Sequence, residues 1–202
     1  MKYKLTDETK NFDGVILHRI ECVTPFADVK AGEKGGWIES ECNLSQTGNA
    51  WVRDNAKVWG DAQILDNAQV RGNAEVYGNA QVFGNAQVYG DAEVCGSAEV
   101  YGFAEVYGFA EVCGDAQVWD NAKVYGDVLV YGNAKVFGNA QVYGNAKVHG
   151  NAMVYENAVV TDNAKVSDKA QVYGNAEVCG NAVLHGNTEV RTDISKRLII
   201  QL

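Results

Sequence analysis

Lysine, histidine and tyrosine side chains are the residues of this chain best suited to binding chemistry. Lys147, His149 and Lys165 lie in the more basic half of the chain, and all three could pair with a phosphate group. Tyr125 and Tyr143 could stack against a nucleobase. Together these five residues predict a possible site for a small nucleotide-like ligand, formed in clefts between the chains of an oligomer.

The histidines are poorly placed for metal or acid–base chemistry. His149 and His185 are 36 residues apart, and His18 lies in a separate N-terminal segment. In the repeat described below, that separation is two turns, or about 9.6 Å of rise, which is too far for both to ligate one zinc ion at about 2.1 Å. The sequence also shows no Ser–His–Asp arrangement and no clear phosphate loop. We therefore expect no catalytic residue, no metal site and no cofactor.

Composition and charge narrow the classes of partner. The 202 residues carry a net charge of −9, which disfavours direct binding to nucleic acid. No apolar run approaches the roughly 18 residues of a membrane span, and the N-terminus "MKYKLTDETK" lacks the apolar segment of a signal peptide. We expect a cytoplasmic protein that does not bind membranes. An odd number of cysteines without a CxxC pair then predicts reduced thiols at Cys22, Cys42, Cys95, Cys113 and Cys179.

A six-residue repeat must position all these side chains. Residues 49–192 divide into 24 consecutive hexapeptides of the form Asn/Asp–Ala–x–Val–x–Gly, without insertion or deletion. Small and branched residues two positions apart are typical of a strand with one buried face. Gly followed by Asn or Asp predicts a corner, because these residues tolerate positive φ. A unit this short cannot bury its own apolar face, so successive units must stack as a solenoid.

The repeat resembles the hexapeptide repeat of left-handed parallel β-helices. The resemblance implies an all-β triangular solenoid with three hexapeptides per 18-residue coil, and about eight coils. Acyltransferases of that class use a loop that protrudes from the helix, together with a histidine base. The uninterrupted repeat offers no such loop, so we expect a protein that is not an enzyme and treat an acyltransferase-like enzyme as the disfavoured alternative.

The two ends depart from the repeat. We expect residues 1–36 to form a β-hairpin cap, residues 37–192 the β-helix, and residues 193–202 an apolar tail that covers the last coil. The N-terminal part also resembles the head of the YdcK-type hexapeptide proteins and their prophage-encoded relatives, which implies a bacterial or phage protein. The matching residues are Phe26, Asp28, Val29, Lys30, Ala31, Gly32, Gly35, Gly36, Trp37, Leu44, Ser45, Gln46, Gly48 and Trp51.

Positions 18 residues apart should stack above one another and form ladders on three exposed faces. On the third face, six consecutive members of one ladder are aromatic, and such an apolar stripe is typical of a protein interface. We expect a homo-oligomer, with a trimer favoured by the family resemblance. The predicted interface residues are Phe83, Tyr101, Trp119, Phe137, Tyr155 and Tyr173.

Phenylalanine interrupts the corner pattern twice, at Phe103 and Phe109 in "YGFAEVYGFAEVCG". A bulky residue at a corner should be strained if it carries the positive φ, unless the preceding glycine absorbs the turn. Aromatic residues with a charged rim are typical of binding hot spots, although drift in a robust repeat is an equal alternative. The predicted hot spot comprises Phe103, Phe109, Tyr101, Tyr107, Glu99, Glu105 and Glu111.

These features predict a non-enzymatic, oligomeric interaction protein. We expect it to be encoded by a phage or prophage and to bind a host protein complex, as an inhibitor or a scaffold. The nucleotide-like ligand described above is the alternative function.

Overall fold

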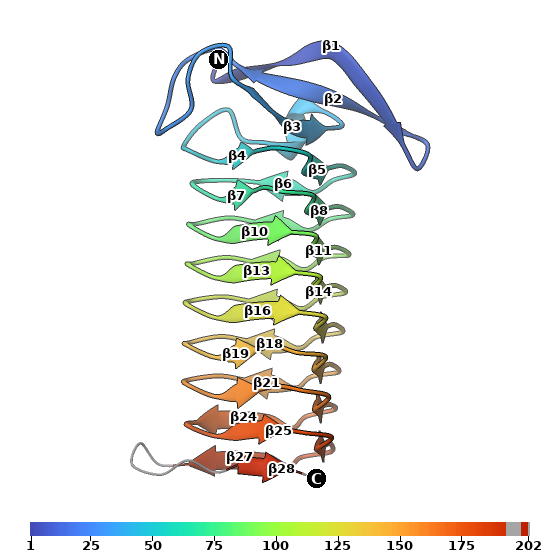
Figure 1. Ribbon diagram of the computed structural model, residues 1–202, viewed down its shortest axis with the longest axis vertical. Coiled ribbons are helices and arrows are strands. Elements are labelled where there is room, and N and C mark those ends of the chain that lie inside the picture. Colours follow the sequence, from blue (N-terminus) through green and yellow to red (C-terminus); the bar gives the residue numbers. More distant parts are fainter. Residues whose placement is uncertain (193–198, 202) are drawn as a thin grey trace.

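The computed structural model describes residues 1–192 and 199–201, which form an all-β solenoid of stacked coils (Figure 1). Residues that pair across neighbouring coils are 18 apart, as for Val88 and Val106. This confirms the predicted parallel β-solenoid with 18 residues per turn. One of its three sheets has nine strands, one per turn, so the solenoid has one coil more than the eight expected.

Three sheets form the sides of the solenoid, and we number them as the faces above. The first sheet has nine strands. They are β4 (Trp51–Val52), β7 (Gln69–Val70), β10 (Gln87–Gly90), β13 (Glu105–Gly108), β16 (Lys123–Gly126), β19 (Gln141–Val142), β22 (Val159–Val160), β25 (Glu177–Cys179) and β28 (Ile199–Gln201).

The second sheet has eleven strands, because the N-terminal segment adds three to it. They are β1 (Tyr3–Phe12), β2 (Val15–Cys22), β3 (Lys34–Ile38), β5 (Lys57–Val58), β8 (Glu75–Val76), β11 (Glu93–Val94), β14 (Glu111–Val112), β17 (Leu129–Val130), β20 (Lys147–Val148), β23 (Lys165–Val166) and β26 (Val183–Leu184).

The third sheet has eight strands, and a 3-10 turn, η1 (Glu41–Asn43), precedes it in the chain. The strands are β6 (Gln63–Ile64), β9 (Gln81–Val82), β12 (Glu99–Val100), β15 (Gln117–Val118), β18 (Lys135–Val136), β21 (Met153–Val154), β24 (Gln171–Gly174) and β27 (Glu189–Thr192).

The core consists of the small and branched residues of the repeat. From Ala50 to Val178, the side chains at the second and fourth hexapeptide positions are all fully buried. The third and fifth positions point outward, because successive side chains of a strand alternate between its two faces. The functional candidates at these positions therefore lie on the three outer faces, whereas Phe103 and Phe109, at the first hexapeptide position, lie at corners.

The corners depend on the last residue of each hexapeptide. Gly102 and Gly108 have φ of +72° and +78°, and a Cβ at either would lie 2.9 Å from the backbone nitrogen of the next coil. Where aspartate replaces glycine it also adopts positive φ, and its carboxylate accepts a hydrogen bond from the next coil. Asp54 Oδ2, for example, accepts from the backbone N–H of Gly72 at 3.1 Å.

The N-terminal hairpin covers one end of the stack, as predicted. Strand β1 pairs antiparallel with β2 and β2 with β3, and β3 then pairs parallel with β5 of the first regular coil. Tyr3 and Trp51 are fully buried and meet edge to face, with ring centroids 6.2 Å apart. At the other end β28 pairs with β25, but the remainder of the expected apolar tail, residues 193–198 and 202, lies outside the described residues.

Candidate functional site

The predicted aromatic ladder on the third sheet is present as a column of stacked rings. Neighbouring centroids from Phe83 to Tyr173 lie between 4.3 and 5.7 Å apart, and the planes are within 6° of parallel. The rings pack their faces against one another and are half-buried within a single chain. Self-association through this ladder stays a prediction, because stacking already explains much of its stability.

The first sheet carries a second ladder, of four tyrosines. Tyr89, Tyr107, Tyr125 and Tyr143 stack with centroids 4.7 to 5.0 Å apart. The guanidinium of Arg71 closes one end, 4.5 Å from the centre of the Tyr89 ring. Burial raises the pKa of the Tyr107 and Tyr125 hydroxyls, so the ladder favours neutral tyrosine.

Phe103 and Phe109 stand at the two edges of strand β13. Their side chains are 63% and 65% exposed, and Phe103 lies at the corner before β13 while Phe109 lies at the corner after it. Neither has positive φ, so the glycines before them absorb the turn, and the strain considered from the sequence is not present. Tyr107 lies on the strand between them. The first sheet therefore presents three aromatic side chains across one coil.

The other members of the predicted hot spot are spread around the same coil. Tyr101 and Glu99 lie on the third-sheet side, and Glu111 on the second sheet. Glu105 lies on the first sheet, where its carboxylate pairs with Lys123 at 2.8 Å and accepts from the Tyr89 hydroxyl at 2.9 Å. The hydrogen bond from Lys123 lowers the pKa of Glu105. The structure thus brings together Phe103, Tyr107, Glu105 and Phe109 on one side and places the other three residues on the remaining sides.

The predicted ligand residues also divide between two sheets. Tyr125 and Tyr143 belong to the tyrosine ladder of the first sheet. Lys147 and Lys165 are paired neighbours on the second sheet, where the His149 ring stacks on Tyr131 at 4.8 Å. One site using all five would have to reach around a corner or form between chains, and it stays a prediction.

Two cysteines correct the expectation of reduced thiols. Cys95 and Cys113, one coil apart on the second sheet, form a disulfide. Their spacing of 18 residues equals one coil, so the period itself was the signal that could have found the pair. Cys22 and Cys179 are free and buried, and Cys42 is free and exposed.

A polar cleft lies where the N-terminal segment meets the first sheet. Its volume is about 290 Å³. The lining residues are Asp28, Arg53, Gln69, Arg71 and Gln87. Sequence reasoning missed this site, because the arginines occur at ordinary fifth positions and Asp28 lies in an irregular loop far away in sequence.

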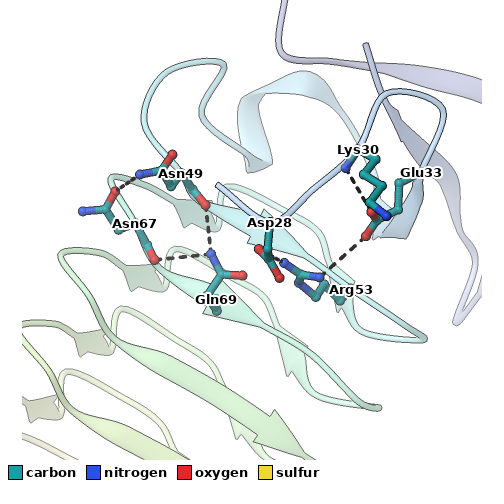
Figure 2. A network of polar contacts seen from close by, with 7 residues as sticks. All are labelled: Asp28, Lys30, Glu33, Asn49, Arg53, Asn67 and Gln69. Carbon is teal, nitrogen blue, oxygen red and sulfur yellow. Dashed lines mark hydrogen bonds and ion pairs between the residues drawn. The ribbon is translucent and has the colours of Figure 1, made fainter. Parts of the chain in front are cut away.

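Hydrogen bonds hold the wall of this cleft in place (Figure 2). Arg53 Nη2 pairs with Asp28 Oδ1 at 2.5 Å, and Nη1 lies 3.6 Å from Glu33 Oε1. Gln69 Nε2 donates to the backbone oxygens of Asn49 and Asn67 at 2.8 and 3.4 Å. Arg53 is therefore neutralised by carboxylates of the N-terminal segment.

Arg71, one coil further on, is the less compensated cation of the cleft. Its Nη2 donates to Gln87 Oε1 at 3.1 Å, and its guanidinium rests on Tyr89. Within the part of the chain that the structure describes, no carboxylate forms an ion pair with Arg71. A guanidinium with remaining donors next to two glutamine amides is suited to binding a phosphate or carboxylate group.

The described residues contain neither a metal-binding cluster nor a membrane-spanning helix. Among residues 1–192 and 199–201, no three His, Cys, Asp or Glu side chains are grouped so that they could hold a metal ion. No helix in this part of the chain is long and apolar enough to cross a membrane.

Comparison with known proteins bears on both the repeat and the chemistry. The family model described as "YdcK Beta solenoid repeat" matches residues 170–186. This segment of the chain has the YdcK-type β-solenoid repeat. The chain is also 43% identical over 61 residues to the Escherichia coli K12 protein named "Uncharacterized acetyltransferase YdcK". That match covers 26% of this chain and 19% of the relative, so it spans less than a fifth of the YdcK relative's length.

This relative corrects one expectation from the sequence. The missing loop predicts a protein that is not an enzyme, whereas the YdcK relative is named an acetyltransferase. The expectation considered only those hexapeptide acyltransferases that carry a protruding loop. The name of the relative points to an enzyme, and it rests on a short shared segment.

Proposed function

We propose that this β-solenoid takes part in acetyl transfer and that the cleft beside Arg71 binds an anionic group of the acetyl donor. The observation that carries the proposal is the 43% identity of one segment to a protein named an acetyltransferase. The usual biological acetyl donor, acetyl-coenzyme A, is a thioester whose carrier bears several phosphates. A binding site for it therefore needs local positive charge.

The charge distribution supports this choice of cleft. The chain carries a net charge of −9, so a polyanionic donor is repelled by the molecule as a whole. Arg71 lines a cavity with Gln69, Gln87 and the Arg53–Asp28 ion pair, and it supplies the positive charge there that no carboxylate of the described residues pairs with. Guanidinium groups bind phosphate oxygens through paired, charge-assisted hydrogen bonds, which can offset part of the long-range repulsion.

Calorimetric titration with acetyl-coenzyme A tests the proposal, with Arg71→Gln as the decisive variant. We expect this variant to bind the donor at least about tenfold more weakly, because one charge-assisted contact contributes about 1.5–3 kcal/mol. Arg191→Gln is the matched control: Arg191 also rests on the end of an aromatic ladder, 5.7 Å from Tyr173, but it lies outside the cleft. The control should bind like the wild type.

Transfer itself is measured by release of free coenzyme A thiol in the presence of amine and hydroxyl acceptors. Turnover that decreases in Arg71→Gln and persists in Arg191→Gln supports the cleft. A wild-type protein that neither binds the donor nor releases thiol would contradict the proposal. Equal losses in both variants would place the donor elsewhere on the molecule.

A second candidate function is recognition of another protein through Phe103 and Phe109. The observation that favours it is the exposure of both rings, 63% and 65%, at the two edges of one strand. A phage origin and a host complex as the target remain predictions, as does the nucleotide-like ligand.

Affinity capture from a bacterial lysate tests the recognition surface, because a specific partner should be retained by the wild type and lost from Phe103→Asn/Phe109→Asn. Equal retention by both proteins would argue against it.

A further inference from the structure

One row of outward side chains on the second sheet has an ordered charge pattern. The third hexapeptide position reads, from β8 to β23, three glutamates, one leucine and two lysines. These residues stack in register from coil to coil, because each strand pairs in parallel with the next. The row comprises Glu75, Glu93, Glu111, Leu129, Lys147 and Lys165.

Within one chain this row places like charges next to each other. Glu93 and Glu111 are direct register partners, and so are Lys147 and Lys165. Like charges directly opposite on neighbouring strands are destabilising. Glu75 is compensated by Lys57 at 2.7 Å, but among residues 1–192 and 199–201 the other four form no ion pair.

The pattern is antisymmetric about Leu129. Glu111 lies one coil before it and Lys147 one coil after it, while Glu93 and Lys165 lie two coils away on opposite sides. A half-turn about an axis parallel to β17 reverses the order of the coils and exchanges each glutamate with a lysine. Two copies related by that half-turn would have complementary charges at these four positions.

We propose that a second copy of this chain packs antiparallel on the second sheet, with the twofold axis at the coil of Leu129. Glu111 of each copy then faces Lys147 of the other, and Glu93 faces Lys165. A single pair thereby occurs twice, as a twofold interface requires. Attraction between the chains then offsets the repulsion within each chain.

The residues at the centre of the row fit a contact between identical surfaces. Leu129 is half-buried, and Tyr131 on the same coil is 40% exposed, one of few large apolar side chains in the repeat that reach solvent to this extent. In the proposed dimer both face their own counterparts at the axis. An apolar centre with charged residues on both sides is the usual arrangement of a protein interface.

The other two sheets are less suited to this arrangement. On the first sheet, Glu105 already pairs with Lys123 of its own chain at 2.8 Å. On the third sheet, Glu99 and Lys135 are placed symmetrically about Gln117, but they provide only one such pair. Among the described residues, the second sheet alone has a row with two uncompensated charges of each sign.

The predicted contact is modest in size. Seven coils, from Glu75 to Val183, can face one another, which is about 29 Å along the axis at about 4.8 Å per coil. Each side of a coil is about 13 Å long, the length of about four extended residues. The surface buried by both copies is then on the order of 1000 Å², near the lower limit for a specific interface. We therefore expect a dimer that dissociates on dilution and with added salt. The Arg71 cleft lies on the first sheet and stays open, so this proposal does not depend on acetyl transfer.

Charge reversal with sedimentation or light scattering tests the dimer. The wild type, at tens of micromolar and low salt, should have twice the chain mass of 21.8 kDa. Glu111→Lys and Lys147→Glu should each raise the dimer dissociation constant at least about tenfold, because either change makes two like-charge contacts. The double variant Glu111→Lys/Lys147→Glu restores the pairing and should dimerise like the wild type.

Mixing the two single variants gives the sharpest result. In a heterodimer of Glu111→Lys with Lys147→Glu, both central pairs join opposite charges, because one copy carries lysine at positions 111 and 147 and the other carries glutamate at both. An equimolar mixture should therefore dimerise like the wild type, although neither variant does so alone. The mixture should therefore be compared with each variant alone.

Folding is not expected to suffer, because each substitution places a charge opposite in sign to that of its own-chain neighbour, Glu93 or Lys165. Thermal unfolding of each single variant, monitored by circular dichroism, checks this.

Lys135→Glu is the matched control on the third sheet, since it makes the same change in the same hexapeptide position. It should leave the dimer intact. A wild-type monomer at high concentration, or a trimer, would overturn the proposal. So would equal weakening by Lys135→Glu, or failure of the double variant to associate.

Discussion

Phe103 interrupts a hydrogen-bonded column of asparagines that otherwise runs along one corner. Asn49 donates to Asn67 at 3.0 Å and Asn67 to Asn85 at 3.2 Å, and beyond the gap Asn121 donates to Asn139 at 3.3 Å. The backbone is not disturbed, because the Phe103 N–H still donates to Asp120 O at 2.6 Å. The phenylalanine therefore replaces two side-chain hydrogen bonds with an exposed ring.

Restoring asparagine at this position should raise stability. Phe103→Asn can rejoin the two halves of the column, and we expect a gain on the order of 1 kcal/mol, since each exposed amide bond contributes about 0.5 kcal/mol or more. Chemical denaturation of the purified protein measures the change. Phe103→Ala is the control, because it removes the ring without adding an amide. If alanine stabilises as much as asparagine, the column has no part in the effect.

Lys2 is a buried cation under the N-terminal hairpin. It is only 6% exposed, and its Nζ donates to Ala50 O at 2.9 Å. Burial lowers the pKa of Lys2 to about 8 from 10.5. Between these two values the unfolded chain binds more protons than the folded chain, so stability contributed by Lys2 rises with pH across this window.

A comparison with Lys2→Met isolates this contribution. We expect the stability of the wild type relative to the variant to rise from about pH 8 to about pH 10, because the variant lacks the titrating group. Taking the difference removes the opposing effect of Cys22, whose pKa is raised by burial and which titrates in both proteins. Denaturation curves at closely spaced pH values provide the measurement. A constant difference would show that the Lys2 ammonium is not penalised in the fold.

At the scale of elements, the outer ladders run from strand to strand across each sheet, and the 18-residue spacing of the sequence predicts which residues stack. The third-sheet rings from Phe83 to Tyr173 stack because equivalent positions recur every 18 residues. The same spacing gives the tyrosine column on the first sheet and the sulfur pair on the second. Each ladder ties together strands that are only two to four residues long.

The tyrosine ladder should make the solenoid sensitive to alkali. Burial raises the pKa of Tyr107 and Tyr125, so above about pH 10 the unfolded chain loses these protons before the folded chain does. Stability from these residues is then present below about pH 10 and falls as pH rises further. Tyr107→Phe/Tyr125→Phe keeps the stacked rings and should reduce the fall above about pH 10.

Melting temperatures at neutral and alkaline pH check this expectation. The double variant should melt close to the wild type at neutral pH. Tyr131→Phe removes a hydroxyl from an exposed ring outside the ladder and controls for the substitution itself. An undiminished fall in the double variant would assign the alkaline transition to other groups.

At the scale of the whole molecule, the sequence predicted the regular part well and the irregular part poorly. Alternation of Ala and Val, with glycine at the corners, was enough to predict the buried core and the parallel sheets, and the break in the repeat predicted the capping hairpin. The Arg53–Asp28 pair was not predictable, because it joins the repeat to a loop of unconstrained conformation 25 residues earlier. Periodicity predicts neighbours only where both partners obey the period.

The candidate sites show the same division. The 18-residue period was enough to assign Phe103, Tyr107 and Phe109 to one coil and Tyr107 to the first face. The cleft at Arg71 is formed partly by the N-terminal segment, so its lining could not be read from the repeat. The missing-loop argument against an enzyme relied on one class of protein and was wrong.

Because each coil has three sides, the number of hexapeptides before a residue decides on which face that residue lies. Each hexapeptide carries the chain one third of the way around the axis, so loss of a single hexapeptide leaves every corner and buried valine in place while turning everything downstream by about 120°. Loss of three hexapeptides only shortens the rod. Glu111 and Lys147 share a face because two full coils separate them. Changes of length can thus rearrange the surface of such a protein, and with it the partners it meets, without disturbing its interior.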